Sequence, residues 1–348
     1  MHMADALLSP AVGATLWAGT AATIGYASKK LNQELDDRKI PLMGVLGAFI
    51  FASQMINFTI PGTGSSGHMG GGMILAILLG PHAAFLVMAS ILTVQALFFA
   101  DGGLLALGCN IWNMGIFPCY ICYPLIYKPL AGNGNNPRRV FAAALIGAIV
   151  GLQLGAFSVA IQTFLSGKSE LPLGTFVLLM QPIHLAIGIV EGLVTAGVIH
   201  YVRAVRPEII ESCETGSRIP KNLSLGNVLA VFFILAAVTG GALSWFASAH
   251  PDGLEWSIEK ITGNAQLPEH EHGLPAQLKQ LQKKTALFPD YGFKPTAEET
   301  ADATQQATSW PAIDAGTTAS GLAGGALVLA LSLATGYMVR VLRKSRAR

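Results

Sequence analysis

The chain has 348 residues, of which 52% are hydrophobic and only 12% charged, with a mean hydropathy of +0.51. This composition excludes an ordinary soluble domain, because several stretches approach the roughly 20 apolar residues that span a bilayer. The formal net charge of +2 gives no sign of a nucleic-acid partner, and four cysteines do not make a secreted disulfide framework. We therefore expect an all-α polytopic membrane protein.

The N-terminus begins Met1-His2 and carries no recognisable signal peptide, so we expect the mature chain to begin at Met1. The α-amino group of Met1, the His2 imidazole and, once deprotonated, the His2 amide can chelate a metal ion through short rings. Nickel(II) and copper(II) favour such nitrogen donors in a square-planar set. His68, in a glycine-rich loop, is the candidate for the fourth nitrogen. A second-position histidine alone, however, occurs by chance in most proteins.

Hydrophobic segments follow in chain order, and lysine and arginine residues orient them. The first, residues 9–28, ends in Lys29 and Lys30, which the positive-inside rule places in the cytoplasm. The N-terminus is then outside. The second, residues 41–58, returns outward and brings the loop of His68 to the same side as Met1.

The apolar run of residues 73–99 must break at Gly80-Pro81, because only a break leaves Asp101 outside and Lys128 inside. The third segment is then short or re-entrant, and neighbouring protein must cover its ends. The remaining predicted spans, which bring the total to nine, are residues 104–127, 140–165, 173–202, 225–247 and 315–341.

The composition changes after residue 202 and divides the chain. We expect a seven-helix unit at residues 1–206 and a cytoplasmic linker at 207–223. A two-helix C-terminal module follows at 224–348, with a polar external loop at 248–314.

Several motifs in a fixed order carry a family resemblance. They are Met1-His2 with Leu8-Ser9-Pro10, Gln54-Met-Ile-Asn-Phe58 before Ser66-Gly67-His68, Asp101-Gly-Gly with Asn110-Ile-Trp-Asn113, and Glu191-Gly-Leu-Val-Thr195. Together they resemble the CbiM/NikM family, the substrate-binding components of energy-coupling-factor transporters for nickel and cobalt. Pro251-Asp-Gly-Leu-Glu255 is similar to the small companion component of those systems. The chain therefore resembles a NikMN-like fusion of the two components.

The resemblance implies that nickel(II), or alternatively cobalt(II), is a transported substrate held by Met1, His2 and His68 in a near-planar nitrogen set. It implies a multi-pass protein of the inner membrane with its metal site on the external side. It also implies two kinds of partner, a transmembrane coupling subunit and ATP-binding cassette ATPases. The chain has no phosphate-binding loop, so we expect ATP hydrolysis in the partners and no enzyme activity here.

Other polar and small residues have two interpretations each. Asn110 and Asn113, with Ser66, either orient the two histidines or join helices inside the membrane. The sequence does not choose between these roles. A stripe of small residues lies on the first segment, at Ala14, Ala18 and Ala22. By resemblance it docks the coupling subunit, and internal packing is an equal alternative.

Further candidates are less favourable as metal ligands. Cys119 and Cys122 are better explained as packing residues, and the histidines at 270 and 272 as part of a solvated loop. His184 and Glu191 share a helix face and are expected to be buried partners or conformational contacts, which we favour over direct metal ligation. The rival functions are a self-sufficient metal channel or carrier and an intramembrane metalloenzyme. The chain has no His-Glu-x-x-His motif and few ionisable residues in its later spans, which favours the transporter component.

Overall fold

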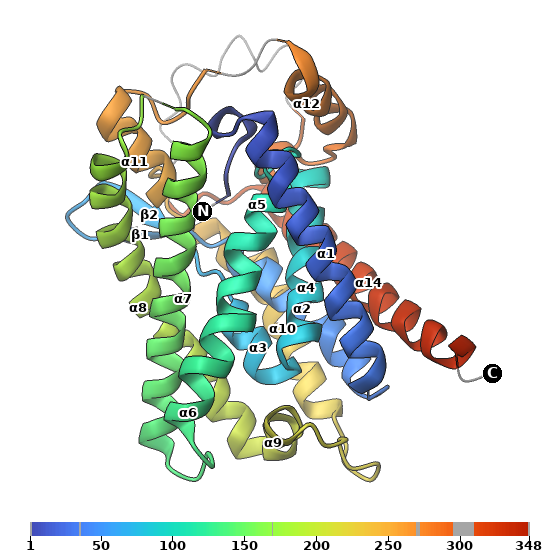
Figure 1. Cartoon of the computed structure of the whole chain (residues 1–348). Helices are drawn as coiled ribbons and strands as arrows, with labels where there is room; N and C mark the ends of the chain where they lie inside the picture. Colours follow the sequence, from blue (N-terminus) through green and yellow to red (C-terminus); the bar gives the residue numbers. More distant parts are fainter. Residues whose placement is uncertain (1, 35, 169, 269–271, 295–309, 347–348) are drawn as a thin grey trace.

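The computed structural model describes residues 2–34, 36–168, 170–268, 272–294 and 310–346. This part of the chain is a helical bundle with one short hairpin, as expected for an all-α membrane protein (Figure 1). The helices before residue 216 are α1 (Pro10–Glu34), α2 (Lys39–Gln54), α3 (Gly72–Leu79), α4 (Pro81–Val94), α5 (Leu107–Ile111), α6 (Lys128–Ala131), α7 (Pro137–Leu165), α8 (Leu173–Val205) and α9 (Pro207–Thr215). Those that follow are α10 (Gly226–Gly241), α11 (Gly253–Thr262), α12 (Gly273–Thr285) and α14 (Ala315–Arg346).

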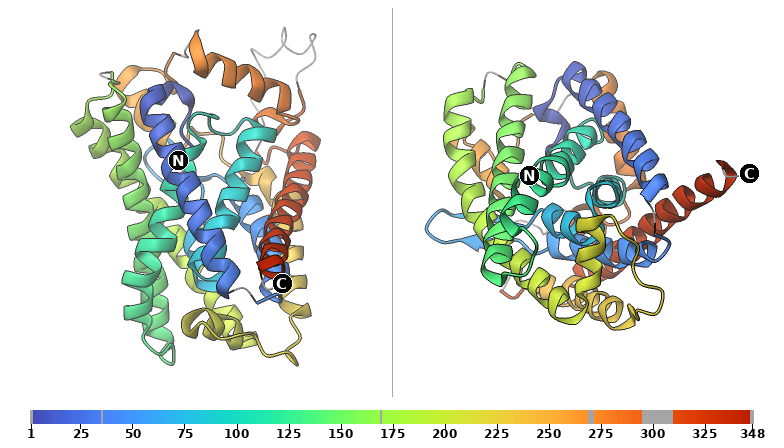
Figure 2. Two further views of the ribbon diagram at one scale, coloured as in Figure 1. Left: turned by 45° about the vertical axis from the view of Figure 1, so that its right-hand side comes forward. Right: turned by 60° about the horizontal axis from the view of Figure 1, so that its bottom comes forward.

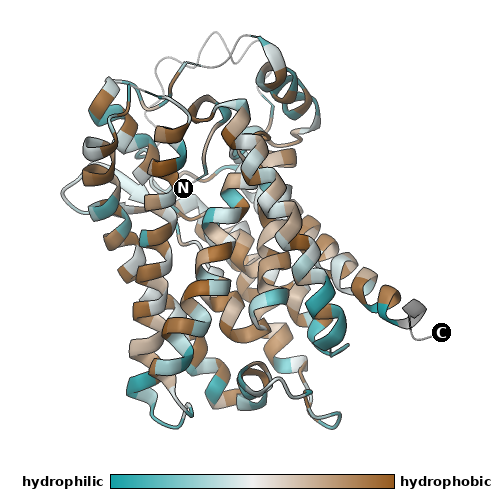
Figure 3. Ribbon diagram, in the orientation of Figure 1, coloured by the Kyte–Doolittle hydropathy of each residue, from teal (hydrophilic) through white to brown (hydrophobic). Residues whose placement is uncertain are grey.

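Four helical stretches in the described residues are long and apolar enough to cross a membrane. They are Pro81–Phe99, Pro137–Leu165, Leu173–Val205 and Ala315–Arg343, and the apolar helices α2 and α10 are shorter. Hydrophobic residues dominate the middle of the bundle, whereas hydrophilic ones gather at its ends (Figure 3). The bundle therefore has the polarity of a membrane protein, and the nine-span topology stays a prediction.

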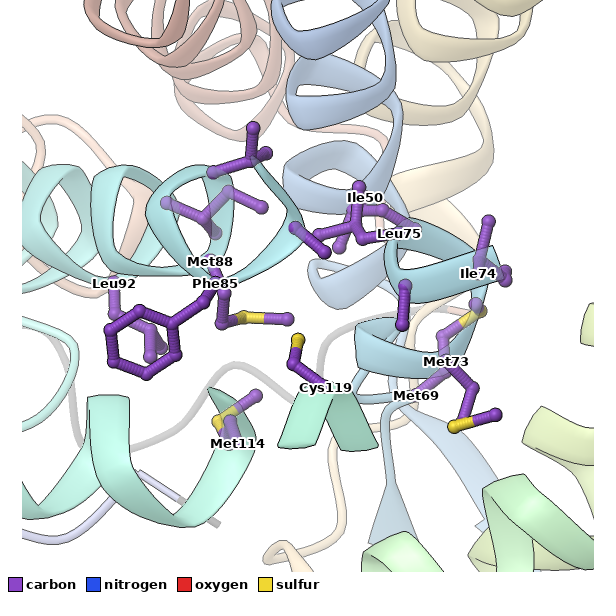
Figure 4. Close-up of a cluster of buried hydrophobic side chains, with 14 of the residues drawn as sticks. Ile50, Met69, Met73, Ile74, Leu75, Phe85, Met88, Leu92, Met114 and Cys119 are labelled. Carbon is purple, nitrogen blue, oxygen red and sulfur yellow. The ribbon is translucent and has the colours of Figure 1, made fainter. Parts of the chain in front are cut away.

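The predicted break at Gly80-Pro81 is confirmed, and it isolates a short buried helix. Gly80 has a φ of +82°, which separates α3 from α4, and Pro81 begins α4, where its missing N–H costs nothing. All eight residues of α3 are buried. Apolar side chains of other elements, such as Ile50 and Cys119, lie in the same buried cluster as its Ile74 and Leu75 (Figure 4). Neighbouring helices thus cover α3 on every side, as a short element at membrane depth requires.

Two segments depart from regular α-helix. Residues Gln95–Phe99 and Trp112–Tyr127 form wider π-helical turns, and the second contains Pro118 and Pro124. Each proline lacks an N–H, so a regular hydrogen-bond ladder cannot pass through them. Cys119 and Cys122 lie fully buried in this segment among apolar side chains, which confirms their role in packing.

Two predicted segment ends were wrong. The second segment was expected to reach residue 58, but α2 ends at Gln54, and β1 (Phe58–Ile60) pairs antiparallel with β2 (Ser65–Gly67). The eighth was expected to reach residue 247, but α10 ends at Gly241 and a 3-10 turn, Leu243–Phe246, follows. In both places hydrophobic residues continue beyond the last turn of the helix, so hydropathy alone overestimates helix length.

The C-terminal module packs against the first unit along α2. Helices α10 and α14 both lie on α2, and α14 also touches α4. At one end of the bundle, Arg340 and Arg343 each pair with Asp37 at 3.0 Å. The N-terminus, α11 and α12 lie at the opposite end from α6 and α9 (Figures 1 and 2). The candidate ligands therefore lie at the end of the bundle that is remote from the basic clusters.

Candidate metal centre

The N-terminal segment is held in place by backbone contacts. Met1 lies outside the described residues, and the segment that follows it runs beside α5. The Met3 N–H donates to Asn110 Oδ1 at 2.8 Å, and Asn110 Nδ2 donates back to the Met3 carbonyl at 3.2 Å. The Gly103 N–H also donates to the Met3 carbonyl, at 2.9 Å. Three contacts at Met3 thus fix the position of His2, one residue earlier.

The structure brings His2 and His68 together. Their rings are stacked with centroids 5.0 Å apart and an angle of 17° between the planes. The His2 side chain is 7% exposed, and its Nδ1 lies 3.3 Å from Asp101 Oδ1. His68 Nδ1 lies 3.2 Å from the Met69 carbonyl oxygen and so carries a hydrogen, which leaves Nε2 with its lone pair. The two predicted side-chain ligands therefore share one site.

Two buried polar atoms at this site lack hydrogen-bond partners among the described residues. They are His2 Nε2 and Gln95 Oε1, and the Gln95 side chain is close enough to affect the pKa of His2. Gln95 uses its other amide atom to donate to Gln54 Oε1 at 2.8 Å. Buried polar groups without partners are costly and usually point to a bound species or a change of protonation.

Burial controls the ionisation of the two histidines. It lowers the pKa of both His2 and His68 to about 3, with neighbouring positive charge adding to the effect. Both imidazoles are therefore neutral at physiological pH and able to act as metal ligands. Burial also raises the pKa of Asp101, whose second oxygen accepts a hydrogen bond from the Tyr291 hydroxyl.

A buried carboxylate fixes the loop that carries His68. Glu191 Oε2 accepts from the Gly70 N–H at 2.7 Å, and Oε1 accepts from the Gly71 N–H at 3.0 Å. Gln54 Nε2 donates to the Gly70 carbonyl at 2.8 Å. Gly71 has a φ of +75°, and a Cβ on Gly72 would lie 2.4 Å from Pro118 Cγ, so the turn needs glycine at both positions. Glu191 was predicted to be a buried partner, and its partners are these backbone groups.

The three candidate orienting residues have different roles. Asn110 holds the backbone next to His2, whereas Asn113 exchanges hydrogen bonds with Gln162 on α7 at 2.8 and 3.0 Å and so joins two helices. The Ser66 hydroxyl donates to the His250 carbonyl at 2.8 Å. None of the three contacts a histidine ring directly in the described structure.

Two cavities meet at the histidines. The larger, which we call the vestibule, has a volume of about 590 Å³, and its lining includes His2, His68, Asp101, Asp252, Glu255 and Tyr291. The smaller, which we call the inner cavity, has about 10 Å³ and is lined by residues that include His68, Met114, His184 and Asp252. Among the described residues, only His68 and Asp252 line both. The site therefore opens outward through the vestibule and inward toward α8.

The other candidates lie away from this centre. Ala14, Ala18 and Ala22 are all exposed on α1, so the alternative of packing inside the bundle was wrong. The loop histidine at 270 lies outside the described residues. No described group of three or more His, Cys, Asp or Glu side chains has the arrangement of a metal site. Sequence reasoning gave no role in the site to Gln54, Gln95 or Asp252. The available signals were that Gln54 and Gln95 are amides in apolar helical segments and that Asp252 lies in a polar turn.

Comparisons with known proteins match the chain to metal transport proteins. Residues 2–209 match the family model described as the cobalt uptake substrate-specific transmembrane region, CbiM, and residues 226–341 match the PDGLE domain. The chain is 32% identical to a putative fused nickel transport protein NikMN of Archaeoglobus fulgidus, over 96% of this chain and 97% of that one. It is 28% identical to the cobalt transport protein CbiM of Sorangium cellulosum, over 61% of this chain and 95% of that one.

Similarity extends to a solved structure. A crystal structure of a truncated transition metal transporter is 32% identical and has a TM-score of 0.53. The match covers 59% of this chain and 99% of that one.

The first prediction concerns Glu191. Replacing it with glutamine should lower nickel affinity about tenfold, because an amide presents one acceptor oxygen where the carboxylate presents two, and the loop of His68 loses a support. Titration calorimetry of the purified variant measures the affinity. Glu211→Gln, an exposed position on α9, is the control and should bind as the unaltered protein does. Equal affinities in the two variants would show that the loop does not depend on the carboxylate.

Proposed function

Because the chain belongs to the CbiM family, we propose that it is the substrate-binding component of an energy-coupling-factor transporter that imports nickel(II). The proposal is carried by one observation: two uncharged imidazoles, one of them on the chain's second residue, are stacked with ring centroids 5.0 Å apart. Relatives named as nickel and cobalt transport proteins support metal uptake as the activity. The ion is the substrate of the protein.

The ligand set follows from the chemistry of the N-terminus. The α-amino group of Met1, the deprotonated amide of His2 and the His2 imidazole chelate the ion, and His68 Nε2 completes the set. A short chelate ring that includes the His2 amide nitrogen closes through His2 Nδ1. The ion therefore replaces the contact between His2 Nδ1 and Asp101. The hydrogen then moves to Nε2, beside the unpaired acceptor Gln95 Oε1. The two orphaned atoms of the ion-free site thus become partners when the ion is bound.

Nickel is preferred to cobalt because a planar set of four nitrogen atoms suits nickel(II) better. The fused relatives from Archaeoglobus fulgidus and Rhodobacter capsulatus are named for nickel transport, which supports the same choice. Cobalt(II) uptake is the second candidate, since the matching family model is described by cobalt.

Energy for uptake comes from partner subunits. The chain contains no phosphate-binding loop, so the ATPases and a transmembrane coupling subunit drive the transport. The exposed stripe of Ala14, Ala18 and Ala22 on α1 offers a surface to which a partner helix can come close. With basic residues facing the cytoplasm, the N-terminus and the metal site face the outside of the inner membrane.

The direct test of the site is His68→Ala. Loss of one nitrogen donor should lower nickel affinity about tenfold or more while the protein still folds. Equilibrium dialysis with nickel measures the affinity, and thermal unfolding measures the fold. His200→Ala, at an exposed position near the far end of α8, is the control. An affinity that does not change in His68→Ala would remove His68 from the ligand set.

The pH dependence of binding should come from the N-terminus. Since the pKa of His2 and of His68 is about 3, neither imidazole releases a proton when the ion binds between about pH 5 and 8. The amide loses one proton at any pH, and the α-amino group, with an ordinary pKa of ~7.7–8, loses a second only below that value. Nickel affinity should therefore fall as the pH falls.

Proton release, measured by calorimetry in buffers of different ionisation enthalpy, should be about one per ion above pH 8 and about two below it. A steep additional step near the ordinary histidine pKa of ~6.5 would contradict the account.

A further inference from the structure

The C-terminal module touches the segment that carries His68 and the segment that faces His2. The Ser66 N–H donates to the Pro251 carbonyl at 2.8 Å, and residues Ser66 and Asp252 form a parallel β-bridge. On the other side of the vestibule, Gln282 Nε2 donates to the Gly102 carbonyl at 2.6 Å, next to Asp101. The module therefore bridges the segment of His68 and the segment that faces His2.

The turn at residues 251–255 is built to place one carboxylate. Asp252 Oδ1 accepts from the N–H groups of Leu254 and Glu255, both at 2.9 Å, and so caps α11. The Glu255 side chain closes a capping box with the backbone N–H of Asp252. Gly253 lies against α8, where an added Cβ would be 2.6 Å from Ile183 Cγ2 and 3.2 Å from His184 Cε1. Close packing and capping together fix Asp252 between the vestibule and the inner cavity.

The inner cavity is lined by a second buried imidazole that offers a lone pair. His184 is 1% exposed, and its Nδ1 lies 2.8 Å from the Met180 carbonyl, so Nδ1 carries the hydrogen. Its other nitrogen therefore holds a lone pair, and the described structure gives that nitrogen no hydrogen-bond partner. His184 and His68 line the same cavity as Asp252. Two imidazoles with available nitrogen atoms and one carboxylate thus surround a space of about 10 Å³.

We propose that Asp252 supplies the negative charge that balances a divalent ion at this centre, so that the C-terminal module contributes a residue to the metal site. The inference rests on the proposed function. The ion, held by neutral amine and imidazole nitrogen atoms and by one deprotonated amide, brings a net positive charge into a buried site, which is unfavourable unless a further negative charge lies nearby. Asp252 lines both cavities that meet at His68. The module thereby raises affinity for divalent ions.

Asp252→Asn and Glu255→Gln form a matched pair for the test. Asparagine is as good a helix cap as aspartate, and glutamine serves in a capping box as glutamate does, so both variants should keep α11. Each removes one negative charge from the vestibule lining. In the full chain, Asp252→Asn should lower nickel(II) affinity about tenfold or more. Glu255→Gln should change it by less than about threefold, and equal affinities in the two variants would overturn the inference.

A variant that keeps the charge separates an electrostatic role from a structural one. Asp252→Glu retains the negative charge and should bind nickel(II) within about threefold of the unaltered chain, whereas Asp252→Asn should not. Equal losses in the two variants would mean that Asp252 only supports the fold, and would overturn the inference. If His68→Ala loses binding and Asp252→Asn does not, the inference fails while the proposed function stands. An unaltered chain that binds no nickel overturns both.

Discussion

The metal centre depends on two hydrogen bonds from adjacent backbone N–H groups to one buried carboxylate. Glu191 accepts from Gly70 and Gly71, the turn that precedes α3. A carboxylate inside the bundle is unfavourable unless its oxygens are satisfied, and the first N–H groups of a helix need acceptors. The carboxylate oxygens therefore accept the hydrogen bonds that these N–H groups must donate. The same two hydrogen bonds connect α8 to the N-terminal end of α3 and set the position of His68, two residues before the turn.

Much of the fold follows from hydropathy and from two residue types. The break between α3 and α4 is predictable because Gly80 takes a positive φ and Pro81 lacks a donor. The hairpin was not predictable, since Ser65 and Ser66 are polar yet buried, and the Ser66 N–H donates to the carbonyl of Pro251, far along the chain. Helix ends were overestimated where apolar residues continue beyond the last turn. Long-range contacts decide these features, and periodicity does not reveal them.

The residues of the site likewise include some whose position follows from the sequence and some whose position does not. The proximity of His2 and His68 could be predicted, because chelation through short rings needs only neighbouring nitrogen atoms and one further donor in a flexible loop. Ligation by Met1, which lies outside the described residues, stays a prediction. Asp101 and Asp252 could not, since each gains its role from a contact with a distant segment. Composition is a limited guide to the roles of the buried amides. Asn110 holds the backbone beside His2, whereas Asn113, three residues later, joins two helices and donates to the Met3 sulfur at 3.7 Å.

The central claim is that the amino terminus itself is a ligand. One added alanine before Met1 moves the α-amino group out of the chelate ring, whereas one added after Arg348 changes nothing at the site. The decisive measurement is the nickel content of the two purified proteins after dialysis against nickel. The account predicts that the N-terminal extension abolishes binding and the C-terminal extension leaves it intact. Equal nickel content in both would contradict it.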